Sequence, residues 1–293
     1  MISVIIPSYN RSSTIGASVQ SVLQQTYTDI EVIVVDDGSV DSTEAIVKAI
    51  NDKRLRYVYQ ENAGACVARN KGVELARGDI IAFHDSDDIW HEDKLEKQMK
   101  KLKVSQADVI FCKLNQIENR KLISQLPSQI GEGFVEPHVS LAGIGTQTIL
   151  GKKEVFVNEK FRNDMPRLQD LELMIRITRK YKVYCVNEGL VDYYIGEDSI
   201  SSNPEKFFIA CNKILTIYPD LEDTNPELVN DLVGMMKGSL KKYILDGGKD
   251  YIKYSNWILQ HQLSAKNLVF YLLSITRIYP IILKSIIQTN DLS

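Results

Sequence analysis

Hydrophobic and polar positions follow two different periods along the first 115 residues of the chain. Five short segments are typical of strands, four as continuous apolar runs and one alternating: 3–7, 31–35, 55–59, 79–84 and 108–112. Between them apolar positions recur at helical spacing, as Ile15, Val19 and Val22 do. Strand and helix in regular alternation predict right-handed parallel crossovers, and therefore an α/β fold with a doubly wound, mostly parallel sheet and flanking helices.

The helical segments and the later chain predict how that sheet is extended. Helices are expected over 15–23, 41–50, 65–76, 91–104 and 170–180, the second opened by a capping box, and a short strand is expected over 183–187. Residues 113–168 are less regular, and helical patterns dominate from Pro204 onward. We therefore expect one domain over 1–203, in halves 1–115 and 116–203, and a C-terminal helical region over 204–293.

Charge and cysteine content exclude several classes of protein. The 293 residues carry 35 Lys and Arg against 38 Asp and Glu, a net charge of −3, which gives no basic face for nucleic acid. The four cysteines include no C-x-x-C pair, so neither a zinc site nor a disulfide framework is expected. Because Met1 leads directly into an apolar run, no signal peptide is expected. These features favour a reducing, cytoplasmic location.

The C-terminal segment 267–287 is apolar but is interrupted by Arg277, Pro280 and Lys284. A spanning helix needs about 20 mostly apolar residues, so we do not expect one here. Residues 251–293 hold four basic residues against Asp291, a net charge of +3. Three readings stay open: peripheral contact with the inner face of a membrane, a homodimer through these helices, or packing on the main domain.

Polar residues follow three of the expected strands, at the ends where open parallel sheets bind ligands. They are Tyr9 to Arg11, the pair Asp36 and Asp37, and the acidic turn 85–88. Three acids in one turn repel unless a cation lies between them, and Mg²⁺ or Mn²⁺ commonly shares its shell with substrate phosphates. The alternative is a solvated acidic turn that caps the next helix. No G-x-G-x-x-G follows the first strand and no P-loop is present, which excludes dinucleotide-binding and P-loop enzymes.

The order and spacing of these motifs resemble the family 2 glycosyltransferases of GT-A fold, of the bacterial type. The resemblance rests on five segments: 3–10, 35–39, 68–72, 78–88 and 169–176. The first four cover roughly residues 1–115, and the fifth, Gln169-Asp170-Leu171-Glu172, resembles a Glu-Asp motif ahead of an amphipathic helix. The resemblance implies an inverting transfer of a sugar, a hexosyl or N-acetylhexosaminyl group, from a UDP-sugar to an acceptor hydroxyl.

The resemblance also implies roles on the nucleotide side of the site. Pro7 and Tyr9 correspond to the edge that binds the base, where the ring of Tyr9 stacks on uracil. Asp37 corresponds to a carboxylate that accepts a hydrogen bond from the pyrimidine N–H. Arg69 corresponds to a cation near the nucleotide, and Asp85 to an acid on the donor side.

Metal binding and the catalytic base are implied in the same way. Asp85 and Asp87 occupy the acidic positions of the D-x-D element, with Asp87 as the direct metal ligand and Asp88 as its supplement or replacement. Asp170 corresponds to the base that takes the acceptor's proton, at a helix start that stabilises a carboxylate. Gln169 departs from the family, which more often has Glu there.

The acceptor is less defined. The resemblance implies a glycan, glycolipid or glycoprotein acceptor in surface polysaccharide or glycoprotein glycan synthesis. Where the family often has Tyr-Arg and then His, this chain has Ile195 and Glu197-Asp198, which puts a diphosphate contact from this segment in doubt and leaves an ordered flap or a plain loop as the alternative. Two other functions stay open: a sugar-phosphate nucleotidyltransferase, which usually has a Gly-rich loop after its first strand, and a non-catalytic UDP-sugar-binding protein.

Overall fold

The computed structural model describes residues 1–293 except 195–203, 246, 250, 278, 281–282 and 284–293. The chain divides into two compact units, one of residues 1–165 and 169–197, the other of residues 166–168 and 198–293. The domain boundary expected at residue 203 falls among the residues that are not described, and so does the departure at 195–201 from the family pattern. The boundaries expected from the sequence are therefore retained as a proposal.

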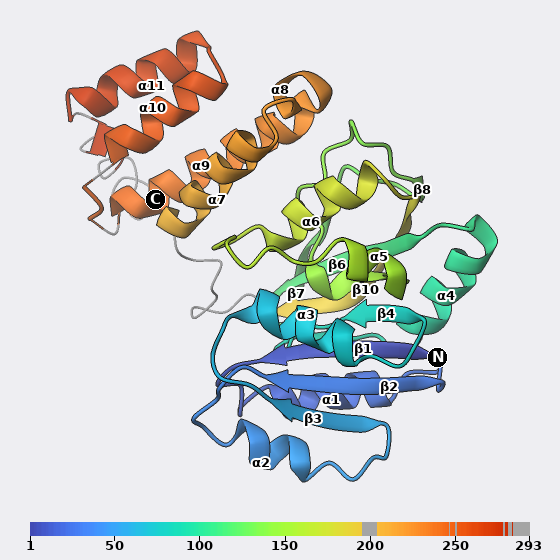
Figure 1. The fold of residues 1–293 in the computed structure, drawn as a ribbon. Coiled ribbons are helices and arrows are strands. Elements are labelled where there is room, and N and C mark those ends of the chain that lie inside the picture. The colour runs from blue at the N-terminus through green and yellow to red at the C-terminus, as the bar shows by residue number, and fades with distance from the viewer. Residues whose placement is uncertain (195–203, 246, 250, 278, 281–282, 284–293) are drawn as a thin grey trace. The chain divides into compact units, whose positions relative to one another are not determined.

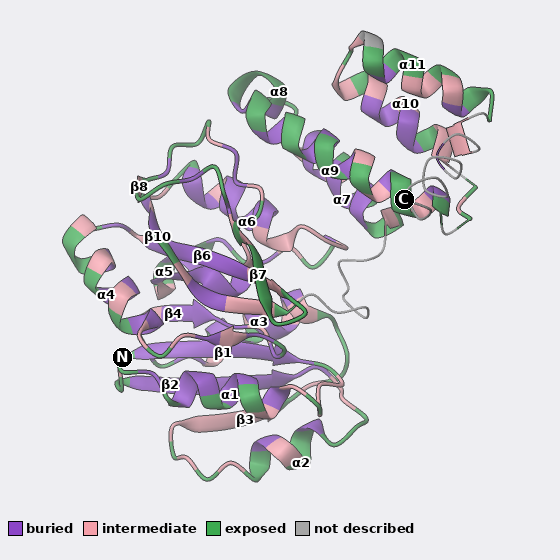
Figure 2. Cartoon of the chain, turned by 180° about the vertical axis from the view of Figure 1, so that it is seen from behind, coloured by how far each residue is buried: buried purple, intermediate pink, exposed green. Residues whose placement is uncertain are grey.

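The first unit is built on one ten-stranded sheet (Figure 1). Eight strands follow one another across it in the order β3-β2-β1-β4-β9-β6-β10-β5, while β7 pairs with β6 and β8 with β10. The strands are β1 (Ile2–Ser8), β2 (Ile30–Asp36), β3 (Leu55–Tyr59), β4 (Ile80–Phe83), β5 (Ile89–Trp90), β6 (Val109–Glu118), β7 (Lys121–Leu126), β8 (Gly133–Phe134), β9 (Ile149–Lys152) and β10 (Val183–Tyr194). Because β1 and β2 are flanked on both sides and covered on both faces, every one of their residues is buried (Figure 2).

Helices cover both faces of the sheet. They are α1 (Ile15–Leu23), α2 (Thr43–Lys48), α3 (Ala65–Leu75), α4 (Lys94–Ser105), α5 (Lys153–Asn158) and α6 (Gln169–Thr178), with a 3₁₀ turn η1 (Thr146–Thr148). On one face Val19 of α1 and Leu95 of α4 pack with Val4 and Val32 of the strands. On the other, Phe83 of β4 packs edge-to-face on Phe156 of α5, with ring centroids 4.9 Å apart. Figure 1 shows α3, α5 and α6 on this second side.

This architecture confirms the expected doubly wound α/β class. The first four strands are parallel, with β1 between β2 and β4. One feature differs from the expectation of uninterrupted parallel crossovers: β9 lies between β4 and β6 and is antiparallel to both. Its four residues come from the stretch 113–168, which the sequence pattern left without elements.

Strand β10 is longer than the five residues expected, because it continues through two register shifts around Gly189. A Cβ atom at Gly189 would lie 2.0 Å from Oδ1 of Asn115 on β6, so a larger residue there would displace the side chain of Asn115. The segment Asn187-Glu188-Gly189 resembles a turn in sequence, which explains the short prediction.

The capping box expected at the second helix is wrong. Oδ1 of Asp41 accepts a hydrogen bond from the backbone N–H of Thr43 at 3.0 Å, and the helix begins only there. The Glu44 carboxylate does not reach back to Asp41, because it accepts a hydrogen bond from Nζ of Lys48 at 2.5 Å. In a capping box the side chain of the N-cap residue accepts from the backbone N–H three residues later, whereas Asp41 accepts from the N–H two residues later. The predicted helix at 91–104 likewise begins later, at Lys94.

The second unit is helical in its described residues, as the sequence predicts for the region after Pro204. Its helices are α7 (Pro204–Ile217), α8 (Leu221–Thr224), α9 (Pro226–Leu245), α10 (Tyr251–His261) and α11 (Ala265–Ile275). Phe208 of α7 and Tyr254 of α10 pack edge-to-face in its core, with ring centroids 4.6 Å apart. Within the described residues, no helix combines the length and the hydropathy that crossing a bilayer requires.

Candidate active site

The acidic turn lies where β4 ends, at the edge of the sheet formed by the carboxyl ends of the parallel strands. β4 stops at Phe83, and the backbone N–H of His84 still donates to the carbonyl of Ile5 on β1 at 2.9 Å. Oγ of Ser18 on α1 donates to the carbonyl of Asp85 at 2.9 Å and holds the start of the turn. This is the edge at which open α/β sheets bind ligands.

Arg69 joins three parts of the chain at this edge. It projects from α3, and its buried Nη2 lies 2.8 Å from Oδ1 of Asp85, whose side chain is 27% exposed. Its Nη1 donates to Oε1 of Gln169 at the start of α6, at 3.3 Å. Burial alone would lower the pKa of Arg69, but the carboxylate of Asp85 outweighs it and raises the pKa. The arginine is therefore a fixed positive charge between the acidic turn and α6.

Asp170 follows Gln169 in the first turn of α6. Its Oδ1 accepts a hydrogen bond from the backbone N–H of Leu171 at 2.8 Å, which leaves Oδ2 for another partner. Burial raises the pKa of Asp170, Asp85 raises it further, and Arg69 opposes both. The structure therefore brings Asp85, Arg69 and Asp170 to one place, although residue 170 is 85 positions from Asp85 in the chain.

The other two acids of the turn differ in exposure. The side chain of Asp87 is 46% exposed, with Oδ2 3.5 Å from Nη2 of Arg11. Asp88 is only 1% exposed, and its Oδ2 has no hydrogen-bond partner among the described residues. Partial burial raises the pKa of the Asp87 carboxyl and nearly complete burial raises that of Asp88, and the negative charge of Asp85 raises both further. An added cation would relieve this repulsion.

These carboxylates fit a divalent cation of the Mg²⁺ or Mn²⁺ type. An orphaned buried oxygen on Asp88 and an exposed carboxylate on Asp87 are hard oxygen donors, which such ions prefer. Within the described residues no group of three or more His, Cys, Asp or Glu side chains is placed to hold a metal by itself. That matches cations that take one or two carboxylates from the protein and the rest of their shell from substrate phosphates and water.

The residues expected on the nucleotide side have unequal environments. Tyr9 is 48% exposed, so its ring is available to a ligand. Pro7 is buried in β1 beside Val35 of β2 and shapes the turn rather than presenting a surface. Pro7 has no backbone N–H to donate to a neighbouring strand. Because β4 pairs with β1 only as far as Ile5, no hydrogen bond of that pair is lost at Pro7.

Asp37 is committed largely to its own chain. Its Oδ1 accepts from Nε2 of Gln60 at 2.7 Å and from the N–H of Ala63 at 2.9 Å, and its Oδ2 accepts from the N–H of Gly64 at 2.8 Å. A carboxylate has about four acceptor positions, so one remains for a ligand. Asp37 therefore fixes the loop before α3, and it has room for a single base contact.

Two residues of the site were not singled out from the sequence. Arg11 pairs with Asp87, and the sequence showed only that it follows the first strand. The side chain of Gln147 in η1 lies beside Asp88 and opposes the rise in the pKa of its carboxyl, while the backbone carbonyl of Gln147 accepts from Nε1 of Trp90 at 3.1 Å. Gln147 lies in the irregular stretch 113–168, where no sequence pattern distinguished it.

Replacement of Arg69 by Met is expected to lower the free energy of unfolding by about 2–4 kcal/mol, because it leaves Asp85 and Gln169 without their buried partner. Chemical denaturation measures this. The matched control is Lys160→Met, which breaks an exposed ion pair with Glu74 and should cost less than about 1 kcal/mol. Equal costs for the two variants would contradict a structural role for the buried pair.

Comparison with known protein sequences assigns the chain to a family. A sequence model described as glycosyl transferase family 2 matches residues 3–162. The chain is 35% identical over 233 residues to the putative teichuronic acid biosynthesis glycosyltransferase TuaG of Bacillus subtilis (strain 168), covering 76% of this chain and 88% of TuaG. It is 33% identical over 211 residues to WfgD of Escherichia coli, a UDP-Glc:alpha-D-GlcNAc-diphosphoundecaprenol beta-1,3-glucosyltransferase, covering 70% of this chain and 81% of WfgD.

The fold is also found in solved structures. The crystal structure of residues 1–349 of S. aureus TarS in complex with UDP-GlcNAc superposes with a TM-score of 0.65 at 20% identity. The match covers 89% of this chain and 81% of that one. At this level of identity the likeness shows a shared fold.

Proposed function

The chain belongs to glycosyl transferase family 2 and is a glycosyltransferase; from this premise we propose that it moves a sugar from a UDP-sugar to an acceptor hydroxyl with inversion and with help from a divalent cation. The similarity to WfgD, a UDP-Glc:alpha-D-GlcNAc-diphosphoundecaprenol glucosyltransferase, supports a UDP-linked donor and a lipid-linked acceptor, and the TarS complex supports UDP-sugar binding on this fold. We further propose that the reaction serves bacterial surface polysaccharide synthesis. A glycoprotein glycan is the other acceptor class that this reaction would suit.

One observation carries the proposal: the ion pair between Arg69 and Asp85, continued by the hydrogen bond from Arg69 to Gln169. It connects the donor-side turn of the sheet to the helix that bears Asp170. A direct displacement needs a leaving group on one face of the reacting carbon and a base on the other. The contacts of Arg69 with Asp85 and with Gln169, the neighbour of Asp170, support a single site that holds both the acidic turn and the proposed base.

On the donor side, each residue has a role that its environment allows. The exposed ring of Tyr9 stacks on the base, and the remaining acceptor position of Asp37 takes the pyrimidine N–H. Pro7 holds the turn that carries Tyr9. Arg69 attracts the nucleotide through its charge, and Asp85 keeps the guanidinium in place.

Asp87 and Asp88, with Asp85 beside them, would hold Mn²⁺ or Mg²⁺. When bound, the cation offsets the negative charge that develops on the leaving diphosphate. Arg11 pairs with the Asp87 carboxylate at 3.5 Å, and Gln147 favours the charged form of Asp88. Within the described residues Oδ2 of Asp88 has no hydrogen-bond partner, so it would be available as a ligand of the cation.

Asp170 acts as the general base. Its Oδ2 takes the proton from the acceptor hydroxyl as that oxygen attacks, while the N–H of Leu171 keeps the carboxylate in place through Oδ1. Gln169 adds no second charge beside it, and its amide oxygen is engaged by Arg69 instead.

The test is a panel of UDP-sugars incubated with the chain and Mn²⁺, with UDP release as the signal. We expect slow hydrolysis of one donor without acceptor, and loss of that hydrolysis when EDTA removes the cation. Formation of UTP from UDP-sugar and added diphosphate would support a nucleotidyltransferase instead. UDP binding without turnover and without metal dependence would support a non-catalytic binder. Family membership favours transfer over both alternatives.

Activity is expected to be lost in acid, and at a higher pH than it would be if the catalytic base were an Asp with its ordinary pKa. The base must be ionised to work, and burial and Asp85 raise the pKa of Asp170 above its usual 3.8, against the opposing charge of Arg69. Turnover is therefore lost as pH falls through the raised value. A profile of kcat against pH measures the acid limb. A limb at or below 3.8 would contradict the role of Asp170 as the base.

The remaining proposals concern the chain as a whole. We propose that residues 1–203 form the transferase domain, 1–115 its donor-binding half and 116–203 its acceptor-binding half, and that 204–293 is a helical C-terminal region. The net charge of +3 over 251–293 supports peripheral contact with the inner face of the membrane, with a homodimer as the second candidate. Sedimentation with anionic vesicles and analytical ultracentrifugation distinguish the two.

A further inference from the structure

Lys94 is a buried lysine that the proposed reaction does not use. It begins α4, and its side chain is completely buried. Burial lowers the pKa of Lys94 to about 8, so the ammonium form still prevails at neutral pH. No carboxylate among the described residues pairs with it. A buried charge without a counter-ion is costly, so Lys94 lowers the stability of the fold unless its other contacts offset that cost.

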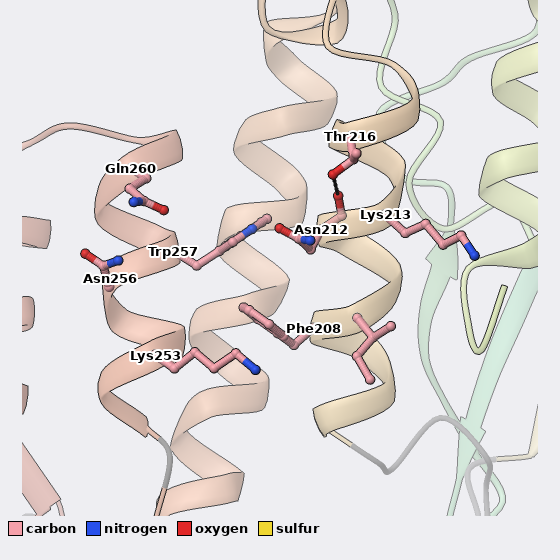
Figure 3. Close-up of a pocket in the computed structure, with 9 residues that line it drawn as sticks. Phe208, Asn212, Lys213, Thr216, Lys253, Asn256, Trp257 and Gln260 are labelled. Atoms are coloured by element: carbon pink, nitrogen blue, oxygen red, sulfur yellow. Dashed lines mark hydrogen bonds between the residues drawn. The ribbon is translucent and has the colours of Figure 1, made fainter. Parts of the chain in front are cut away.

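Two contacts stabilise this charge. Nζ of Lys94 donates to Oε1 of Gln98, one turn later in α4, at 2.7 Å. The same Nζ lies over the ring of Trp90, 3.7 Å from its centroid, in a cation–π contact. Lys253 makes a comparable contact in the second unit, where its Nζ lies 5.1 Å from the ring centroid of Phe208 in a groove between α7 and α10 (Figure 3). Lys253 is exposed, however, whereas Lys94 is held inside the core.

The two partners of this lysine hold the segment that lies against the acidic turn. Nε2 of Gln98 donates to the carbonyl of Thr148 at 2.8 Å, and Nε1 of Trp90 donates to the carbonyl of Gln147 at 3.1 Å. Both side chains are buried. Two consecutive carbonyls of η1 are therefore fixed from α4 and β5. The side chain of Gln147 lies beside Asp88, which is a proposed ligand of the cation.

The ammonium group also decides how the amide of Gln98 is oriented. A carboxamide has an acceptor end and a donor end, and an ammonium group can only donate. Lys94 therefore binds Oε1 and directs the N–H groups of Gln98 toward the carbonyl of Thr148. An apolar side chain in place of Lys94 would leave Oε1 without its donor. The amide would then be free to turn, and the carbonyl of Thr148 would lose its partner.

We propose that Lys94 and Gln98 are positioning residues of the metal site, which hold Gln147 beside Asp88 and thereby fix a carboxylate that the cation uses. Residues around a metal's ligands orient them, and their loss typically costs about 10–100-fold in metal affinity. The inference rests on the proposed function in one respect, since it needs a cation bound at the acidic turn. It gives the buried charge a role, because a neutral apolar side chain would favour folding but could not donate to Gln98.

The experiment compares Lys94→Met and Gln98→Glu with the unchanged protein in two measurements. Calorimetric titration of Mn²⁺ in the presence of UDP gives the metal affinity, and chemical denaturation gives the free energy of unfolding. Lys94→Met removes the buried charge at similar volume, so we expect equal or greater stability but about tenfold weaker Mn²⁺ binding. Gln98→Glu keeps an acceptor for the lysine and removes the N–H donor to Thr148, so we expect a similar loss of affinity.

Lys253→Met is the matched control, because it removes an exposed lysine from the same kind of contact with an aromatic ring. It should bind Mn²⁺ as the unchanged protein does. A merely structural role of Lys94 would lower stability and metal affinity together. Unchanged Mn²⁺ affinity in Lys94→Met or in Gln98→Glu would overturn the proposal, and so would a loss of affinity in Lys94→Met that accompanies a loss of stability.

The unchanged protein separates this inference from the proposed function. If it binds Mn²⁺ with UDP and releases UDP from the donor, while the two variants bind Mn²⁺ as tightly, the positioning role alone is overturned. If the unchanged protein neither binds Mn²⁺ nor releases UDP, the proposed function is overturned and the positioning role with it.

Discussion

Replacement of Asp170 by Asn is expected to lower turnover by about 10²–10⁴-fold, the usual contribution of a general base. The amide keeps the shape of the side chain, and its oxygen can still accept from the N–H of Leu171 as Oδ1 does. What it loses is the ability to take the proton from the acceptor hydroxyl. Affinity for UDP should stay nearly unchanged, because the nucleotide contacts proposed here are made by other residues.

The measurement is kcat with saturating donor and acceptor, together with a UDP titration by calorimetry. Asp164→Asn is the control, since Asp164 is an exposed acid ion-paired with Arg162 a few residues before the same helix. Its turnover should remain within about twofold of the unchanged protein, because surface pairs contribute little. Near-normal turnover in Asp170→Asn would refute the assignment. A parallel loss of UDP affinity would show that Asp170 supports the site structurally.

Replacement of Asp87 by Asn is the second large effect, with turnover in Mn²⁺ expected to fall by about 10²–10³-fold. This loss of turnover follows from the several kcal/mol by which a bound cation would stabilise the negative charge on the leaving diphosphate. The free energy of unfolding should not fall, because partial burial and the charge of Asp85 disfavour the ionised form of Asp87 and raise its pKa. A neutral amide removes the repulsion between the two carboxylates. Calorimetric titration of Mn²⁺ in the presence of UDP should show correspondingly weaker binding.

Asp93→Asn is the matched control for this variant. Asp93 is an exposed acid just before α4, paired with Lys97 at 2.8 Å, and it lies outside the turn. Its Mn²⁺ dependence should equal that of the unchanged protein. If Asp87→Asn kept full activity and the same half-saturating Mn²⁺ concentration, the metal would have to be held without Asp87.

Much of the donor side of the site could be predicted from sequence because it depends on local patterns. A buried strand that ends at Phe83 sets the position of Asp85 at the sheet edge, whatever the rest of the chain does. The same holds for Tyr9 after β1. The resemblance to a family added roles for these residues, and family membership is confirmed.

The parts that could not be predicted depend on contacts between distant segments. Asp37 accepts three hydrogen bonds from residues 60–64, and this loop approaches so closely that a Cβ atom at Gly38 would lie 2.9 Å from the backbone nitrogen of Asn62. Nothing in the local pattern of either segment indicates that approach. Gln147 belongs to the same category, because its place beside Asp88 is defined by segments distant in the sequence.

The antiparallel strand β9 has a consequence for the order in which the chain can fold as it is made. The strands β1 to β4 are complete once residue 83 has been synthesised, and β6 once residue 118 has. β4 and β6 cannot join, however, until Ile149–Lys152 has emerged and entered between them. Until then the nascent sheet has an open edge at β4, beside the acidic turn, where other chains could pair. The site is therefore assembled late in synthesis, when the ribosome has already translated most of the transferase unit.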